Sequence, residues 1–454
     1  MNHSIRARRF FNKEVNLIRD LFDRHNKIWR AAFIVVGVIV SVIQFLRIAR
    51  RPPGDFPLHW TSGHFIATGE FLYTRNINYP YPPFWGFVHS TLAWIPMETA
   101  YLLVYPLFFV ALYVLVRVLN RLSEVHFPLG KNELFWLVTV AILLSSRYLI
   151  RDMLECGVNL ALVAAAWLSV YLWREKKELQ GSLILGFAMA LKCTPSLFWV
   201  WFILKREWKM AGLTFLAAAC FTLSPMLKLG YAEYDRTVRH WVHNVMRGFK
   251  EKDPSRGIVG PVPIANMSLR ITLARYLMHF PREHEGRMKT PLYVDFLNLP
   301  PVTAGRIISL SMLVFLIFIA WLFRRHYDDR SDERILWECA VLSILILLYS
   351  PVTWGQHCVG IFPGVYLLIR SSMSQKHYTK PLKVSIGLFV FLVLILNRAF
   401  IGKFYSELLG TYHTSTFLFL GIIGFLLSRH FRVTREKTAE AALQPAQENA
   451  PVTA

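Results

Sequence analysis

The longest stretch of the chain without Asp, Glu, Lys or Arg is CAVLSILILLYSPVTWGQHCVGIFPGVYLLI, residues 339–369. A membrane-spanning helix needs about 20 mostly apolar residues, because the hydrocarbon core is roughly 30 Å thick. The stretch is long enough for two crossings joined at Ser350-Pro351, where the proline interrupts helical hydrogen bonding. It therefore predicts a pair of membrane helices.

Other uncharged runs repeat this pattern along the 454 residues, at 31–46, 76–97, 99–116, 156–173, 210–227, 307–323 and 408–428. The chain is 54% apolar, and its 51 Lys and Arg exceed its 29 Asp and Glu, which gives a net charge of +22. We predict an all-α, polytopic integral membrane protein with about twelve transmembrane helices. A soluble enzyme or a DNA-binding protein is excluded, and no nucleic acid is expected as a partner.

The basic residues predict the topology, because Lys and Arg are retained on the cytoplasmic side of a membrane. Lys and Arg are concentrated in segments 205–209, 324–334 and 370–383 and occur at both ends of the chain, although 324–334 and the C-terminal tail hold as many Asp and Glu. We expect a basic cytoplasmic segment at 1–30, a transmembrane domain at 31–430 with external loops 49–80 and 228–306, and a disordered cytoplasmic tail at 431–454. The protein is expected in the cell (inner) membrane with both termini cytoplasmic and a crossing at 384–400.

Two arrangements remain open between residues 82 and 204. In the first, 82–97 and 99–118 both cross the membrane, and 181–204 is one kinked helix. In the second, 82–97 lies at the interface, and 181–204 is a hairpin that turns at Lys192–Pro195. Both arrangements give twelve crossings.

The two external loops are more than connectors. Residues 56–73 carry an apolar stripe that predicts a short amphipathic helix on the membrane surface. Residues 228–303 hold twelve Lys and Arg against seven Asp and Glu, although they are expected outside. Long loops are translocated regardless of charge, so the topology stands and the loop is a candidate anion-binding cap.

Few polar side chains have a position that suits chemistry. Asp55 follows the first crossing, where partial desolvation suits a carboxylate to general-base work. Lys192 lies in an apolar stretch, where a cation usually faces a cavity, and is a candidate phosphate contact. Asp152 and Glu155, with two arginines, are expected to form a solvated joint. No metal is expected, because the pairs His240/His243 and His59/His64 lack further ligands.

Four sequence blocks occur in a familiar order: Asp55-Phe56 with Gly63, Gly69 and Tyr73, then Tyr81-Pro82-Pro83; Asn159 through Lys192-Cys193-Thr194-Pro195; Asn266-Met267-Ser268-Leu269-Arg270; and Ser350-Pro351-Val352-Thr353-Trp354-Gly355-Gln356-His357. In these blocks the chain resembles glycosyltransferase family 87 of the GT-C superfamily. Members of that family are integral-membrane mannosyltransferases that use polyprenyl-phosphate sugars. Three positions depart from the family pattern, namely Gly157, Met267 and Gln356.

The resemblance implies a GT-C-like fold whose active site lies on the external loops, with Asp55 as the catalytic base. The expected reaction is an inverting transfer of a hexose, with mannose as the expected sugar, from a polyprenyl-phosphate donor to a glycolipid or glycan hydroxyl. No cofactor is expected. The expected donor- and acceptor-binding residues are Lys192, Asn159, Asn266, Arg270, Trp354, His357, Tyr81 and His59. The resemblance also favours the first arrangement, in which the Tyr-Pro-Pro-led helix crosses.

Two other classes of protein fit part of the pattern. A transporter or flippase for a lipid-linked sugar or another anionic substrate also has many helices, intramembrane lysine and proline breaks. Such proteins usually contain internal repeats with paired broken helices, whereas only the Lys192–Pro195 break is clear here. A non-catalytic membrane partner is the third class, and for it the Asp55 cluster would be a coincidence.

Overall fold

The computed structural model describes residues 2–51, 54–74, 80–258, 260–284, 287, 292–374, 387 and 398–448. This part of the chain is helical, apart from one short antiparallel pair formed by β1 (Arg256–Gly257) and β2 (Gly260–Pro261). The predicted helical class is confirmed. Most of the expected crossing at 384–400 lies outside the described residues.

Five described helices are long and apolar enough to cross a membrane. They include the 26–50 part of α1 (Asn2–Arg50), α4 (Met97–Ser123), α5 (Lys131–Leu154), α12 (Pro301–Phe323) and the first part of α17 (Thr414–Glu448). The pair α9 (Trp208–Leu223) and α10 (Met226–Lys250) would add a sixth span, but it bends by 86°. These helices agree with a membrane protein, although the predicted number of about twelve crossings is not confirmed.

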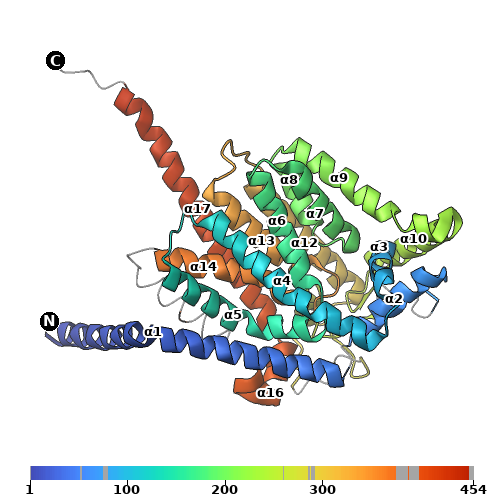
Figure 1. Ribbon diagram of the computed structural model, residues 1–454, viewed down its shortest axis with the longest axis horizontal. Helices are drawn as coiled ribbons and strands as arrows, with labels where there is room; N and C mark the ends of the chain where they lie inside the picture. Colours follow the sequence, from blue (N-terminus) through green and yellow to red (C-terminus); the bar gives the residue numbers. More distant parts are fainter. Residues whose placement is uncertain are drawn as a thin grey trace.

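The buried centre of the bundle is α13 (Glu333–Tyr349), which packs against α14 (Phe362–Ser374) and α17. Figure 1 shows α1 along one edge of the bundle and the end of α17 projecting beyond it. Only 6% of the most apolar window of α1 and 17% of that of α12 are buried inside the protein. Their apolar side chains are therefore available to lipid.

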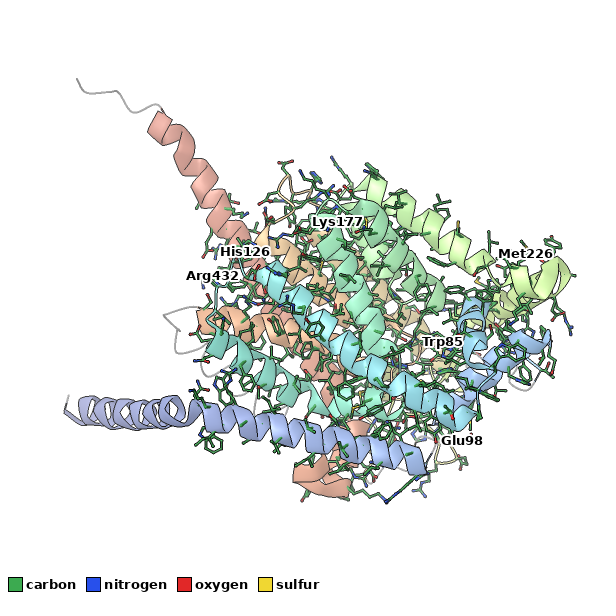
Figure 2. The ribbon with its side chains drawn as sticks, viewed as in Figure 1. Trp85, Glu98, His126, Lys177, Met226 and Arg432 are labelled. Atoms are coloured by element: carbon green, nitrogen blue, oxygen red, sulfur yellow. The ribbon has the colours of Figure 1, made fainter. Side chains whose placement is uncertain are left out.

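The bundle has two distinct ends. Figure 2 shows Trp85 and Met226 at one end, and His126, Lys177 and Arg432 toward the other. The first end also carries α2 (Phe56–Thr68), α3 (Pro83–His89) and η1 (Ser90–Leu92), and we call it the Asp55 end. The second holds a buried carboxylate, Glu338, and we call it the Glu338 end.

One arginine establishes the path of the chain between α6 (Asn159–Arg174) and α9. Arg330 donates to the Trp173 carbonyl at 2.8 Å and to Glu178 at 2.9 Å. Its other terminal nitrogen pairs with Glu207 at 3.0 Å. The end of α6, the start of α7 (Glu178–Leu191) and the residue before α9 therefore meet at the Glu338 end.

The chain turns back at the opposite end of α6. Lys192 follows α7 and donates to Asn159, the first residue of α6, at 3.0 Å. The segment then returns through α8 (Ser196–Leu204), so 181–204 is a hairpin that turns at Lys192–Pro195. The seven-residue α3 is about 10 Å long, too short to cross. The hairpin of the second arrangement thus fits the structure, and the preference for a crossing Tyr-Pro-Pro-led helix is wrong. Whether α7 and α8 cross the membrane stays a prediction.

The predicted amphipathic helix after Asp55 is present as α2, but its apolar stripe packs inside the protein. Phe65 and Ile66 are buried, and α2 packs closely on α3 and η1. Gly63 permits the approach, because a Cβ at this position would lie 2.5 Å from the His89 backbone. The expected placement of this stripe on the membrane surface is therefore wrong.

The C-terminal segment also differs from the expectation. Helix α17 continues to Glu448, whereas a disordered tail is predicted from residue 431. Lys437 on this helix pairs with Asp332 at 2.7 Å, which ties the segment to the loop before α13. The end of α17 is therefore a helical extension of the bundle.

Candidate functional site

A cavity of about 650 Å³ opens at the Asp55 end and brings together segments that lie far apart in the sequence. It is lined by Gly54, Asp55, Arg147, Arg151, Glu155, Ala265, Met267, Trp354, Gly355 and Gln356. Two of the predicted site residues, Asp55 and Trp354, therefore line one cavity. Met267 and Gln356, two of the positions that depart from the family pattern, line it as well.

Asp55 is held between two segments. It is the N-cap residue of α2, and its Oδ2 accepts a 2.9 Å hydrogen bond from the Gln356 side-chain amide. The preceding N–H, on Gly54, donates to Glu155 at 3.0 Å. Glu155 also pairs with Arg151 at 2.7 Å. The loop before α2 is thus fixed by α5 on one side and by the 350–357 segment on the other.

A chain of hydrogen bonds runs beside this loop. Lys192 donates to Asn159 at 3.0 Å, and Asn159 donates in turn to Asp152 at 2.8 Å. The Leu160 N–H donates to the second Asp152 oxygen at 3.0 Å. Asp152 is fully buried, so the solvated joint predicted here is wrong. The only sequence signal for Asp152 is its position at the end of an apolar helix.

The space for this carboxylate explains Gly157. A Cβ at Gly157 would collide with the Asp152 carboxylate. Glycine therefore stands at this position because the neighbouring side chain already occupies the space. This departure from the family pattern is a local packing requirement.

A smaller cavity of about 40 Å³ lies next to the first and contains three further predicted residues. Asn159, Lys192 and His357 line it, together with four hydroxyl residues and apolar side chains. His357 Nδ1 accepts the Trp354 N–H at 3.0 Å. Burial and the charge of Lys192 lower the pKa of His357 well below its usual range. This histidine is therefore a neutral acceptor near neutral pH.

His59 and Tyr81 belong to an aromatic cluster outside both cavities. Tyr81 stacks on Trp85 with ring centroids 4.4 Å apart, and His59 meets both rings edge to face. Burial lowers the pKa of His59, so its ring is neutral. Lys192 lies 5.6 Å from the Tyr81 ring centroid, which links the cluster to the smaller cavity.

Asn266 and Arg270 line neither cavity. The buried Asn266 Oδ1 accepts from the backbone N–H groups of Ser268 and Thr353, at 2.8 and 3.2 Å. Arg270 donates to the carbonyls of Glu251 and Asp253. In the structure Asn266 joins the backbone beside Met267 to the backbone beside Trp354, two residues that line the larger cavity, whereas Arg270 holds the 251–253 loop. Direct substrate contact by either stays a prediction.

Within the described ranges, no group of three or more His, Cys, Asp or Glu residues is placed to hold a metal ion. Metal independence itself stays a prediction. The cations on the larger cavity, Arg147 and Arg151, come from α5. Among the described residues of 228–306, no Lys or Arg lines either cavity, so an anion-binding cap in this loop stays a prediction.

The fold and the larger cavity define a helical membrane protein with a carboxylate-containing pocket at one end of its bundle. The profile of glycosyltransferase family 87 matches residues 79–351, more than half of the chain. The protein belongs to glycosyltransferase family 87, and it is a membrane glycosyltransferase. Asp55, Gln356 and His357 lie outside the matched range.

Two relatives from Mycobacterium tuberculosis are similar to the chain. One is a polyprenol-phosphate-mannose-dependent alpha-(1-2)-phosphatidylinositol mannoside mannosyltransferase, 23% identical over 75% of this chain and 76% of the relative. The other is a polyprenol-phosphate-mannose-dependent alpha-(1-2)-phosphatidylinositol pentamannoside mannosyltransferase. It is 25% identical over 64% of this chain and 58% of its own length.

Proposed function

We propose that the protein transfers mannose from polyprenyl-phosphate mannose to a hydroxyl of a glycolipid, at the external face of the membrane and with inversion at the anomeric carbon. The observation that carries the proposal is Asp55, held by Gln356 in a cavity large enough for a sugar. The family membership and the donors named for both relatives support the choice of donor.

The reaction is a single displacement in this proposal. Asp55 takes the proton of the acceptor hydroxyl while the hydroxyl oxygen forms a bond to the anomeric carbon. The bond from that carbon to the phosphate oxygen breaks, and its electron pair leaves with the polyprenyl phosphate. Gln356 donates to one carboxylate oxygen, which leaves the other oxygen for the proton. The lipid phosphate leaves as an anion, so no general acid is needed.

The leaving phosphate gains negative charge, and cations beside the site are placed to stabilise it. Among the described residues, Asn159 is the one hydrogen-bond acceptor of the Lys192 ammonium group, and Lys192 lines the smaller cavity. Arg147 lines the larger cavity from α5. We assign the phosphate to the side of the site that Lys192 covers.

The distribution of charge between the ends of the bundle supports the external face. The segments 205–209 and 324–334, which hold three and four Lys and Arg, lie at the Glu338 end, where Lys205 and Arg334 are found. Segment 324–334 also holds four Asp and Glu, which contribute little to orientation. Basic segments mark the cytoplasmic side. The Asp55 end is then external, where a polyprenyl-phosphate sugar presents its head group.

Replacing Asp55 by Asn tests the proposed base directly. Asparagine keeps the size of the side chain but does not accept the proton, so the turnover number should fall by about 10²- to 10⁴-fold. The matched control is Glu70→Gln, a carboxylate at the end of the same segment that lines neither cavity. Thermal unfolding in detergent checks that both variants are folded. Wild-type turnover in Asp55→Asn would exclude this residue as the base.

A further inference from the structure

A second basic cavity of about 330 Å³ adjoins the one that contains Asp55. It is lined by Arg47, Ile48, Arg51, Gly54, Arg151, Leu154 and Glu155. Gly54, Arg151 and Glu155 line both cavities, so a single wall separates the two spaces. The loop that carries the proposed base is part of that wall.

This cavity has an excess of positive charge. Three arginines line it against one carboxylate, Glu155, which already pairs with Arg151 and accepts the Gly54 N–H. Arg47 and Arg51 are one helical turn apart, and both are exposed. Neither forms an ion pair with any residue in the described part of the chain. Two arginine side chains are therefore available to an anion.

The position of the cavity favours a lipid as the source of that anion. Arg47 and Arg51 follow the apolar part of α1, where Val42, Ile43 and Leu46 are each about half exposed, at 49%, 54% and 49%. An acyl chain that lies along this surface places its head group at the level of the arginines. The planar guanidinium is suited to a phosphodiester, because its N–H groups form paired hydrogen bonds to two oxygens.

The geometry of a single displacement assigns this lipid to the acceptor. The base lies on the acceptor's side of the anomeric carbon, and the leaving phosphate lies on the opposite side. The cavity adjoins Gly54, the residue directly before the proposed base. Cations on this side are therefore placed for the acceptor's anchor and not for the donor's phosphate.

We propose that Arg47, Arg51 and Arg151 form a binding site for the phosphodiester head group of a lipid acceptor, whose sugar reaches Asp55 across the shared wall. The proposal rests on the proposed function, because it names the acceptor class for the same reaction. It predicts a preference for an acceptor glycan anchored on an anionic phospholipid over the same glycan on a neutral diacylglycerol.

The first test compares these two acceptors with the purified full chain in lipid nanodiscs. In the Arg47→Gln/Arg51→Gln variant, the ratio of kcat/KM for the phosphatidylinositol-anchored glycan to that for the diacylglycerol-anchored glycan should fall about tenfold. Arg50→Gln is the matched control, because Arg50 lies in the same turn and does not line the cavity. An unchanged ratio, or a rise in the KM of the donor alone, would overturn the proposal.

A second test does not depend on transfer. The Asp55→Asn chain, with and without the two glutamine substitutions, is titrated with fluorescent phosphatidylinositol or phosphatidylcholine. We expect preferential binding of phosphatidylinositol that weakens about tenfold in the Gln/Gln background and is largely restored by Arg47→Lys/Arg51→Lys. Equal binding of the two lipids would refute the site. Preferential binding by the Asp55→Asn chain, together with no sugar transfer by the wild-type chain, would uphold the site and contradict the proposed function instead.

Discussion

Asp55 depends on one side chain for its position. Gln356 reaches it from a segment about 300 residues away and donates to a single carboxylate oxygen. In the family pattern that the chain resembles, a histidine stands at this position. Both side chains carry an N–H donor, so the bond to the base can be kept after the exchange. Gln356 is therefore a positioning residue in our account.

Substituting Gln356 tests this role at the scale of one hydrogen bond. Leucine is similar in size but has no donor, and a hydrogen bond to a charged group contributes about 1.5–3 kcal/mol. The turnover number of Gln356→Leu should therefore fall by about tenfold or more. Gln356→His, which keeps a donor, should retain most of the activity. If both variants show the same turnover, the hydrogen bond does not position the base.

Individual residues also show which parts of the candidate site the sequence did not predict. Asp55 and Trp354 are predicted site residues that do share a cavity. Asp152 is buried in a network with Asn159 and Lys192, although its neighbours Arg151 and Glu155 make the segment look solvated. Helical geometry explains the difference, because successive residues point about 100° apart, so Arg151 is exposed while Asp152 faces the bundle.

At the scale of elements, the sequence predicts where the long apolar helices lie, but it does not predict whether the short helices face lipid or protein. The uncharged runs locate α4, α9 and α12, because apolar length is a direct physical requirement of a membrane. The same reasoning misjudges α2 and α3. Their aromatic residues suit a membrane interface as well as a protein core, and composition does not distinguish these environments. In the structure the His89 backbone lies against Gly63, which shows that α2 packs against protein.

The hairpin of α7 and α8 illustrates the same limit. Its turn at Lys192–Pro195 is visible in the sequence as a charge and a proline in an apolar stretch. Whether the chain kinks or reverses there depends on which residues meet at the far ends of the helices. The contacts of Arg330 with Glu178 and Glu207 decide it, and they link positions that no local pattern connects.

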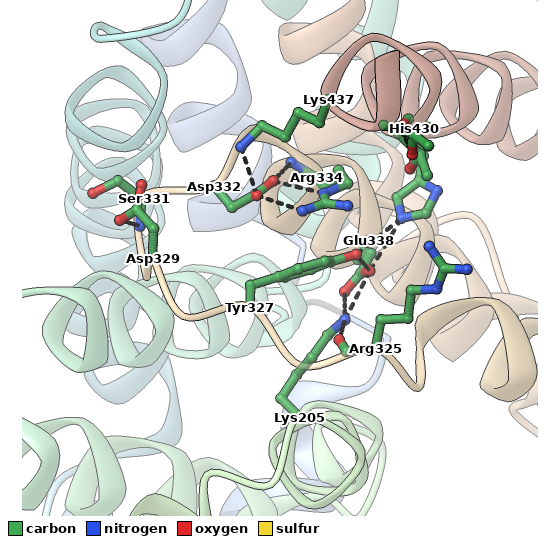
Figure 3. A network of polar contacts seen from close by, with 12 residues as sticks. Lys205, Arg325, Tyr327, Asp329, Ser331, Asp332, Arg334, Glu338, His430 and Lys437 are labelled. Atoms are coloured by element: carbon green, nitrogen blue, oxygen red, sulfur yellow. Dashed lines mark hydrogen bonds and ion pairs between the residues drawn. The ribbon is translucent and has the colours of Figure 1, made fainter. Parts of the chain in front are cut away.

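At the scale of the whole molecule, the two ends of the bundle differ in their polar interactions. Figure 3 shows the Glu338 end, where the buried Glu338 pairs with Lys205 at 2.7 Å. The Tyr327 hydroxyl donates to the same carboxylate at 2.7 Å, and His430 approaches it at 3.2 Å. Residues from α13, α17 and two loops are thereby joined. This end is closed by ion pairs, whereas the Asp55 end is open.

Breaking the buried pair should destabilise the bundle without touching the Asp55 cavity. Lys205→Met leaves Glu338 buried without its cation, and such changes destabilise proteins by about 3–5 kcal/mol. The double variant Lys205→Met/Glu338→Gln removes the uncompensated charge and should recover most of this loss. Thermal unfolding in detergent measures both. A Lys205→Met chain as stable as wild type would show that the pair does not hold this end together.

The most direct test of the proposed function is the donor used and the stereochemistry of its transfer. The purified chain in nanodiscs is given polyprenyl-phosphate mannose or GDP-mannose together with a phosphatidylinositol mannoside acceptor, and the product is examined by NMR. We predict transfer from the lipid donor only, with an anomeric configuration opposite to that of the donor. Transfer from the nucleotide sugar alone, or a product that retains the donor's configuration, would contradict the account.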